Sequence, residues 1–214
     1  MSDTGVADMA MAAAGILSRR HPLGGWTVIL IACLIAAGSW QIGQAVWTYA
    51  KAGLAQFLLQ RAWSRSLAAN EAVPPWPWAD TWPVARMTVP SRHRDLIVLN
   101  GAYGRTLAFG PGYVESSAFP GAPGTTILTG HRDTHFAFLK QLQLGESLTI
   151  HTLDGRTRSY RVTERRIADS RTDRIALDAD RQALVLVTCY PFDTPIPGGP
   201  LRWIVEAEED RTTF

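Results

Sequence analysis

The chain has 214 residues, enough for one ordinary domain together with attached segments. Its formal net charge is only +2, so its composition gives none of the basic excess that is typical of nucleic-acid-binding proteins. We therefore expect no nucleic acid among its partners.

The first feature along the chain is a strongly apolar stretch near the N-terminus. No charged residue occurs from 22 to 50, and this is longer than the roughly 20 apolar residues with which a helix crosses a bilayer. Tryptophans near both of its ends suit the two membrane interfaces. We predict a transmembrane signal-anchor helix at 22–47, preceded by an N-terminal tail at 1–21.

Basic residues flank this stretch unequally. Arg19 and Arg20 precede it, whereas Lys51 is the only basic residue soon after it. The positive-inside rule then places the N-terminus in the cytoplasm and the main domain outside. A cleaved secretory signal with Arg19 and Arg20 as its basic region is the alternative. The length of the apolar run, and the large residues that continue along it, favour the uncleaved anchor.

The segment at 48–83 is predicted to be a helical stalk followed by a linker. Apolar residues recur at helical spacing as far as Leu67, which indicates either a stalk or an amphipathic helix lying on the membrane. Four prolines between 70 and 83 favour an extended path there. We expect the tryptophans at 76, 78 and 82 to pack on the domain that follows.

The remainder, 84–214, has the signals of a small, mainly β domain. Short β-branched or alternating runs are separated by glycine- and proline-containing turns, and Asp154-Gly155 is a strong hairpin signal. One short helix is expected at 135–142. Seven or eight strands over this length predict a closed barrel or a sandwich. The predicted strands are 85–89, 95–99, 125–129, 147–151, 158–163, 183–188 and 202–207.

Cys189 closes the most apolar of these strands, where Tyr190-Pro191 ends the run because proline has no N–H to donate. The other cysteine, Cys33, lies in the middle of the predicted span. Cys189 is therefore a solitary thiol in a compartment that tends to oxidise thiols, and such a cysteine can be a nucleophile. The alternative is an inert, buried cysteine at a strand end.

His131 and Arg202 complete a possible reactive set with Cys189. His131 follows the end of a predicted strand, and Arg202 begins the strand after Cys189. Cysteine is a nucleophile, histidine exchanges protons near neutral pH, and a guanidinium can stabilise a developing oxyanion. We predict these three as catalytic residues: Cys189 as nucleophile, His131 as general acid and base, and Arg202 for the substrate carbonyl or the oxyanion.

A metal site is the rival interpretation of the same histidine. His131, Asp133 and His135 alternate and could supply ligands from one side of an extended segment. No further cluster of histidine, cysteine or acidic residues has ligand spacing, and Arg132 would crowd a cation. We therefore predict no metal and no other cofactor.

At these residues the sequence resembles the sortases, which are membrane-anchored cysteine transpeptidases with a β-barrel. The resemblance is carried by Gly130-His131, by the run that ends in Thr188-Cys189, and by Arg202. The stretches 130–134 and 188–192 look most like the sortases of Gram-negative proteobacteria. One departure is Val185, where the common motif has threonine. This residue lies inside the strand, so we expect it to affect packing or substrate fit.

The resemblance implies a closed sortase-type barrel of seven to eight strands with one or two short helices. It also implies cleavage of a C-terminal sorting signal of the LPxT(G/A) type in a secreted protein. A thioacyl intermediate on Cys189 would then pass to an amine acceptor whose identity the sequence does not give. Thr188 is expected to help fix the substrate or the oxyanion. The implied location is the bacterial inner membrane, with the catalytic domain on the periplasmic side.

Two other functions use the same residues differently. A hydrolytic cysteine protease of this fold would release its product to water instead of transferring it to an amine. A non-enzymatic, membrane-tethered β domain would leave Cys189, His131 and Arg202 without a chemical role.

Overall fold

The structure is a computed structural model that describes residues 24–194 and 198–210. It divides into two compact units, with the boundary between Ala50 and Lys51. The predicted tail at 1–21 lies outside the described residues.

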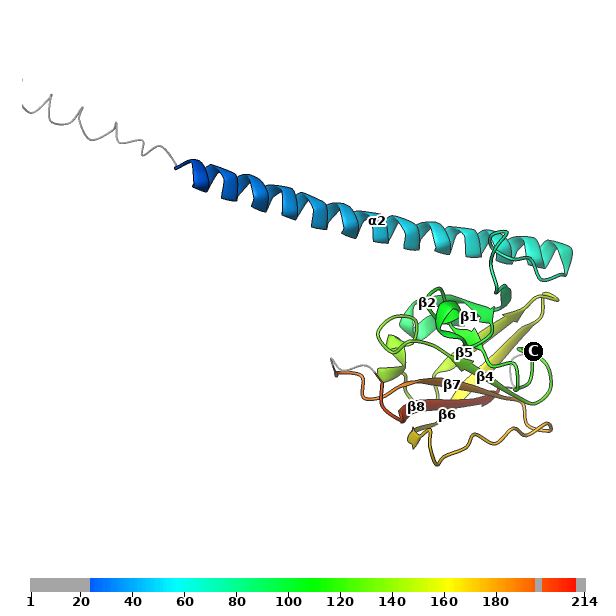
Figure 1. Cartoon of the computed structure of the whole chain (residues 1–214). Coiled ribbons are helices and arrows are strands. Elements are labelled where there is room, and N and C mark those ends of the chain that lie inside the picture. Colours follow the sequence, from blue (N-terminus) through cyan, green and yellow to red (C-terminus); the bar gives the residue numbers. More distant parts are fainter. Residues whose placement is uncertain (1–23, 195–197, 211–214) are drawn as a thin grey trace, which may run out of the picture. The chain divides into compact units, whose positions relative to one another are not determined.

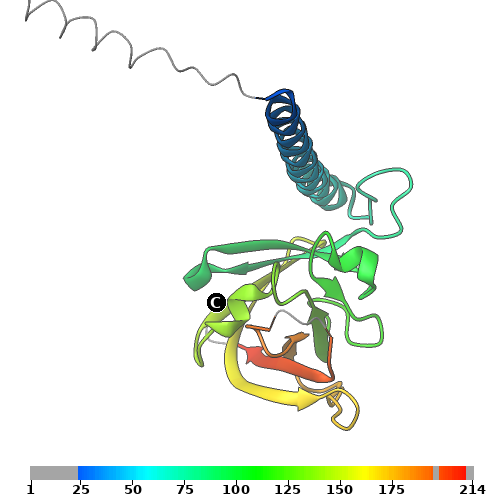
Figure 2. The same cartoon turned by 60° about the vertical axis from the view of Figure 1, so that its left-hand side comes forward.

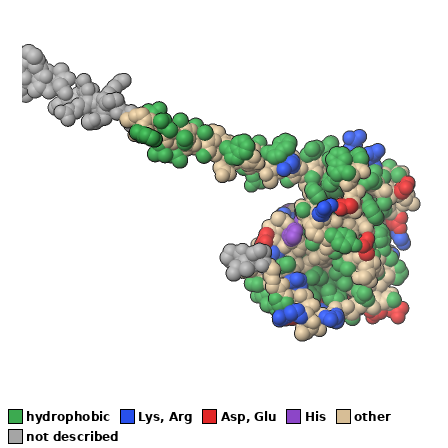
Figure 3. Space-filling view, in the orientation of Figure 1, with side chains coloured by type: hydrophobic (Ala, Val, Ile, Leu, Met, Phe, Trp, Pro, Cys, Tyr) green, Lys and Arg blue, Asp and Glu red, His purple; other side chains and the backbone are tan. Residues whose placement is uncertain are grey.

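The first unit consists of the N-terminal part of helix α2 (Gly25–Ala69). Every residue of the helix as far as Leu54 is exposed, and Figure 3 shows apolar side chains along this part. By length and composition α2 could cross a membrane, and its role as an anchor stays a prediction. The helix continues without interruption past residue 47, so the predicted end of the span at 47 stays a prediction.

The second unit is built on a closed barrel of eight strands (Figure 1). The prediction of a mainly β domain with a closed barrel is therefore confirmed. The order of the strands around the barrel is β1-β2-β3-β4-β7-β8-β6-β5, and β5 pairs with β1 to close it. The strands are β1 (Pro83–Val89), β2 (Arg94–Asn100), β3 (Gly112–Tyr113), β4 (Thr125–Thr129), β5 (Ser147–Thr152), β6 (Thr157–Asp169), β7 (Ala183–Cys189) and β8 (Leu201–Glu209).

Most neighbouring strands are antiparallel, but β4 runs parallel to β7, and β2 runs parallel to the short β3. Parallel neighbours need a long crossover, and here the chain between β4 and β7 forms β5, β6 and the loop at 170–182. β8 then returns antiparallel to β7. Figure 2 shows the long, curved β6 (yellow), which forms part of the barrel wall between β8 and β5. The C-terminal ends of β4 and β7 consequently lie at the same edge of the barrel.

The predicted elements match the structure closely where the apolar pattern is strong. β4 occupies the predicted range, and the hairpin at Asp154-Gly155 joins β5 to β6. β6 is longer than predicted, and β3 and the short helix α3 (Gly104–Leu107) were not predicted. The helix expected at 135–142 is a shorter 3₁₀ turn, η2 (Ala137–Lys140); a second such turn, η1 (Pro90–Arg92), joins β1 to β2.

The C-terminal part of α2 packs on the barrel rather than standing apart from it. Leu59 and Trp63 are 0% and 3% exposed, and they form one buried cluster with Ile97 and Leu99 of β2. The tryptophans of the linker behave differently from one another. The ring of Trp76 packs edge-on against that of Phe109, with their centroids 5.2 Å apart, whereas Trp78 is 82% exposed.

Candidate functional site

The parallel pair β4 and β7 brings the histidine and the cysteine to the same edge. Thr129, the last residue of β4, pairs with Val187 of β7. The Gly130 N–H still donates to the Val187 carbonyl at 3.2 Å, so the ladder continues one residue past β4. His131 and Cys189 each follow this last paired level by two residues, and we infer that they lie opposite each other. The sequence placed both at strand ends but did not predict that the two strands are parallel.

Arg202 joins them from the other side of β7. Cys189 and Arg202 are directly paired in the antiparallel ladder of β7 and β8. Side chains alternate between the two faces of a strand, so Cys189 shares a face with Val187, and Arg202 shares one with Ile204. Val187, Arg202 and Ile204 all line one groove on the outside of the barrel. The thiol and the guanidinium therefore belong to that groove face.

Thr188 points to the other face. It is 1% exposed, and its hydroxyl donates to the carbonyl of Gly130 at 2.7 Å. This bond joins the residue before Cys189 to the residue before His131. The side chain of Thr188 thus contacts the backbone of the histidine loop, and direct contact with a substrate stays a prediction.

The loop that carries His131 is folded back on itself. The Phe136 N–H donates to the His131 carbonyl at 3.0 Å, and the Phe136 ring is fully buried. A Cβ added to Gly130 would lie 2.9 Å from this ring, so the close approach requires glycine here. The buried ring anchors the loop, while the His131 side chain remains exposed.

The groove is a cavity of about 480 Å³ with an apolar floor and a polar end. The floor comes from β4, β7, β8 and the last part of β6, and the wall is the β6–β7 loop at 170–182. The apolar lining consists of Ile127, Ala168, Ile175, Leu177, Val187 and Ile204. Arg202 lies at the polar end together with Asp169 and Asp173. A groove of this kind can hold a short, largely apolar peptide beside the thiol.

Two titratable groups near this edge are shifted by their surroundings. The Arg171 guanidinium, which bonds the Asp169 carboxylate, lowers the pKa of Asp169 to about 2, and the positive charge of Arg202 acts in the same direction. Burial lowers the pKa of the His135 imidazole, and the charge of His131 lowers it further. His135 is therefore neutral at pH 7 and adds no positive charge beside His131.

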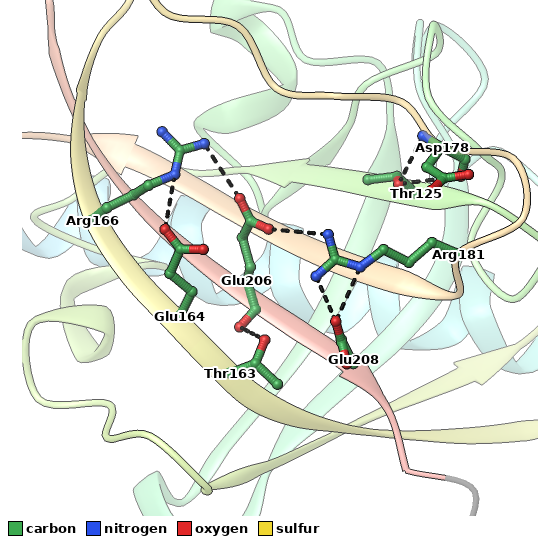
Figure 4. A network of polar contacts seen from close by, with 8 residues as sticks. All are labelled: Thr125, Thr163, Glu164, Arg166, Asp178, Arg181, Glu206 and Glu208. Atoms are coloured by element: carbon green, nitrogen blue, oxygen red, sulfur yellow. Dashed lines mark hydrogen bonds and ion pairs between the residues drawn. The ribbon is translucent and has the colours of Figure 1, made fainter.

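The β6–β7 loop is held to the barrel at its C-terminal end (Figure 4). Arg181 pairs with Glu208 of β8 at 2.6 Å and with Glu206 at 3.7 Å. The Thr125 hydroxyl of β4 donates to the Asp178 carbonyl and accepts from the Asp178 N–H, at 3.4 and 3.3 Å. These contacts fix the end of the loop that forms one wall of the groove.

The residues proposed for the rival metal site do not gather into one. Within the described ranges, 24–194 and 198–210, no group of three or more histidine, cysteine or acidic side chains is placed to hold a metal ion. Asp133 forms a salt bridge with Arg132 at 3.3 Å.

Comparisons with known proteins agree with this fold. The sortase domain family matches residues 87–210, more than half of the chain, and the chain therefore belongs to the sortase family. It is 30% identical to Sortase D of Bacillus subtilis (strain 168) over 120 residues, which are 56% of this chain and 60% of that protein. The match thus spans less than two thirds of this curated relative.

Solved structures show the same architecture. Sortase C-1 from Actinomyces oris is 29% identical, with a TM-score of 0.53 over 60% of this chain and 74% of that one. A Clostridium perfringens Sortase D5 transpeptidase is 21% identical, with a TM-score of 0.59 over 74% of this chain and 99% of that one. At the latter identity the likeness concerns the fold alone.

Proposed function

We propose that the chain is a membrane-anchored cysteine transpeptidase that cleaves a C-terminal sorting signal of the LPxT(G/A) type in a secreted protein. The observation that carries the proposal is the strand pairing at one barrel edge: Cys189 pairs with Arg202 in the β7–β8 ladder, and β4, which precedes His131, runs parallel to β7. Arg202 also lines the apolar groove. The match to the sortase domain family supports the same reaction class.

In the first step the proton of the Cys189 thiol passes to His131, the sulfur attacks the carbonyl carbon of the signal's threonine, and the carbonyl oxygen becomes an oxyanion. Arg202 stabilises this charge. In the structure its Nη1 donates to the carbonyls of Gly199 and Leu201, at 2.7 and 2.8 Å. A guanidinium has five N–H donors, so Arg202 can hold its own loop and a substrate oxygen together.

The tetrahedral intermediate collapses when the C–N bond breaks and His131 gives a proton to the leaving amine. This leaves a thioester between Cys189 and the threonine carbonyl. An amine acceptor then attacks the thioester, His131 takes its proton, and the sulfur departs as the leaving group. Water in place of the amine would give hydrolysis instead of transfer.

The location follows from the apolar helix. We propose that the N-terminal part of α2 anchors the chain in the bacterial inner membrane, with the N-terminus in the cytoplasm and the barrel on the periplasmic side. The exposed apolar side chains of the helix and the two arginines that precede it support this orientation. A secreted substrate held in the same membrane by its own apolar tail would meet the groove there.

The test uses the full chain in detergent with an LPxTG-type peptide and triglycine as the amine. Mass spectrometry should show a thioester adduct on Cys189 and a peptide–triglycine product, and both should be absent in Cys189→Ala. Release of the free acid alone, even at high triglycine, would identify a hydrolytic protease. Equal products from Cys189→Ala and the unaltered chain would contradict any role for the thiol.

A further inference from the structure

Arg132, the residue after His131, is buried although it is charged. Its side chain is 6% exposed, whereas that of its ion-pair partner Asp133 is 70% exposed. Burying a guanidinium costs free energy that an apolar side chain of similar volume would not incur. The position therefore calls for an explanation other than stability.

The guanidinium crosses from the histidine loop to the cysteine loop. One of its terminal nitrogens, Nη1, donates to the Pro191 carbonyl at 2.6 Å, and the other, Nη2, donates to the Thr194 carbonyl at 2.9 Å. Both acceptors belong to the loop between β7 and β8, which starts directly after Cys189 and ends at Pro200, two residues before Arg202. The rigid, planar fork of arginine suits two carbonyls at once, whereas lysine offers its N–H donors from a single nitrogen.

These bonds lie where the barrel's own ladder has ended. Pairing between β4 and β7 stops at Thr129 and Val187, and the bonds of Gly130 continue it by one residue. Beyond that level come the histidine loop after β4 and, after Cys189, the loop between β7 and β8. Arg132 ties them together there, on the residue next to the imidazole and within a few residues of the thiol.

We propose that Arg132 is a positioning residue that sets the distance and orientation between His131 and Cys189. The inference rests on the proposed transpeptidase function. Because proton transfer depends on the geometry of donor and acceptor, loss of this tie mainly affects the step in which His131 protonates the leaving amine. Binding in the groove, which Arg132 does not line, is affected less.

The experiment compares two substrates with the same acyl peptide, cleaved by the full chain in detergent. One has the natural amide bond, whose amine must be protonated on leaving, and the other is a nitrophenyl ester, whose leaving group departs without a proton. For Arg132→Met we expect kcat on the amide to fall about 10- to 100-fold, with KM nearly unchanged. The fall in kcat on the ester should be about tenfold smaller than the fall on the amide. Arg132→Lys keeps the charge but has its donors on a single nitrogen, so its loss of kcat on the amide should be smaller than that of Arg132→Met.

Arg92→Met is the matched control. Arg92 also bridges distant segments, by bonds to the Gln141 carbonyl and to Glu146, but it lies outside the groove lining and the two loops. We expect this variant to change both substrates little. If Arg132→Met does not fold, the same amide-to-ester comparison is made with Arg132→Lys.

Three results would overturn the inference. Equal losses on amide and ester would show that Arg132 only supports the fold, and unchanged amide cleavage in a folded Arg132→Met would show that it has no role. In both cases the unaltered chain is active, so the proposed function stands. If the unaltered chain cleaves neither substrate, the proposed function fails and the inference falls with it.

Discussion

The hydroxyl of Thr188 donates to the carbonyl of Gly130 across 2.7 Å, inside the protein. Thr188 precedes Cys189 and Gly130 precedes His131, so this single bond couples the backbone of the two loops. In Thr188→Val the shape is kept but the Gly130 carbonyl loses its donor. A buried polar group without a hydrogen-bond partner lowers the free energy of unfolding by about 1–3 kcal/mol.

We therefore expect Thr188→Val to lower both the thermal midpoint and kcat, whereas Thr188→Ser should keep most of each. Unfolding followed by tryptophan fluorescence and peptide cleavage by the full chain measure the two effects. Thr163→Val is the control, because the Thr163 hydroxyl also donates to a backbone carbonyl, that of Glu206, but in an exposed position. A Thr188→Val chain as stable as the unaltered one, but inactive, would instead indicate direct contact with the substrate.

Arg202 offers a second test of the site, because charge and geometry can be separated there. Arg202→Met removes the proposed oxyanion donor, and loss of one such donor costs about 10²–10³-fold in kcat. Arg202→Lys keeps the charge but not the fork, so we expect a loss of intermediate size. Both are measured as kcat and KM with the LPxTG-type peptide. If Arg202→Met changed only KM, Arg202 would bind the substrate without stabilising the oxyanion.

Much of this site could be predicted from the sequence because its residues stand at the ends of strongly apolar strands. The run before Cys189 is almost continuous Val and Leu, and β4 matches its predicted range. What local patterns do not contain is which strands become neighbours. The parallel pairing of β4 with β7 joins segments more than fifty residues apart, and it brings the end of the strand before His131 to the same edge as the end of the strand that carries Cys189.

The elements that prediction missed are those whose local signals are weak or mixed. β3 has two residues, Gly112 and Tyr113, and a Cβ added at Gly112 would lie 2.3 Å from the Gly101 carbonyl oxygen, so glycine is required there. β6 extends past its predicted end through Glu164, Arg165 and Arg166, which are charged but lie on a strand next to β8. The burial of Arg132 cannot be predicted from local sequence, because it depends on a loop sixty residues away.

The pH dependence of stability can be tested at Tyr160, which is 1% exposed in the barrel core. Burial raises the pKa of Tyr160 to about 12, from an ordinary value of 10.0. The unfolded chain therefore releases this proton at lower pH than the folded protein. The stabilising contribution is complete below pH 10.0 and is lost as the pH rises toward about 12.

The full loss from this group is on the order of 3 kcal/mol. Tyr160→Phe should remove that part of the alkaline destabilisation, and the measurement is unfolding by urea at several pH values between neutral and strongly alkaline. The same slope in both proteins above pH 10.0 would show that Tyr160 does not contribute.

The last prediction concerns the wall of the groove, which Arg181 holds to Glu206 and Glu208 (Figure 4). The side chain of Arg181 is 43% exposed, so these ion pairs are screened by salt and are worth at most about 1 kcal/mol. In Arg181→Met we expect nearly unchanged global stability, a looser β6–β7 loop and a KM raised by up to about fivefold. Because the loop lines the groove but does not carry Cys189, His131 or Arg202, kcat should stay the same.

Peptide kinetics and limited proteolysis at 170–182 measure the two effects, and high salt should move the unaltered chain toward the variant. Arg161→Met is the matched control, since Arg161 pairs with Asp210 at the far end of β6 with similar exposure, 52%. It should change neither KM nor cleavage of the loop. A KM that stays unchanged in Arg181→Met, although the loop is cut faster, would show that substrate binding does not depend on this wall being fixed.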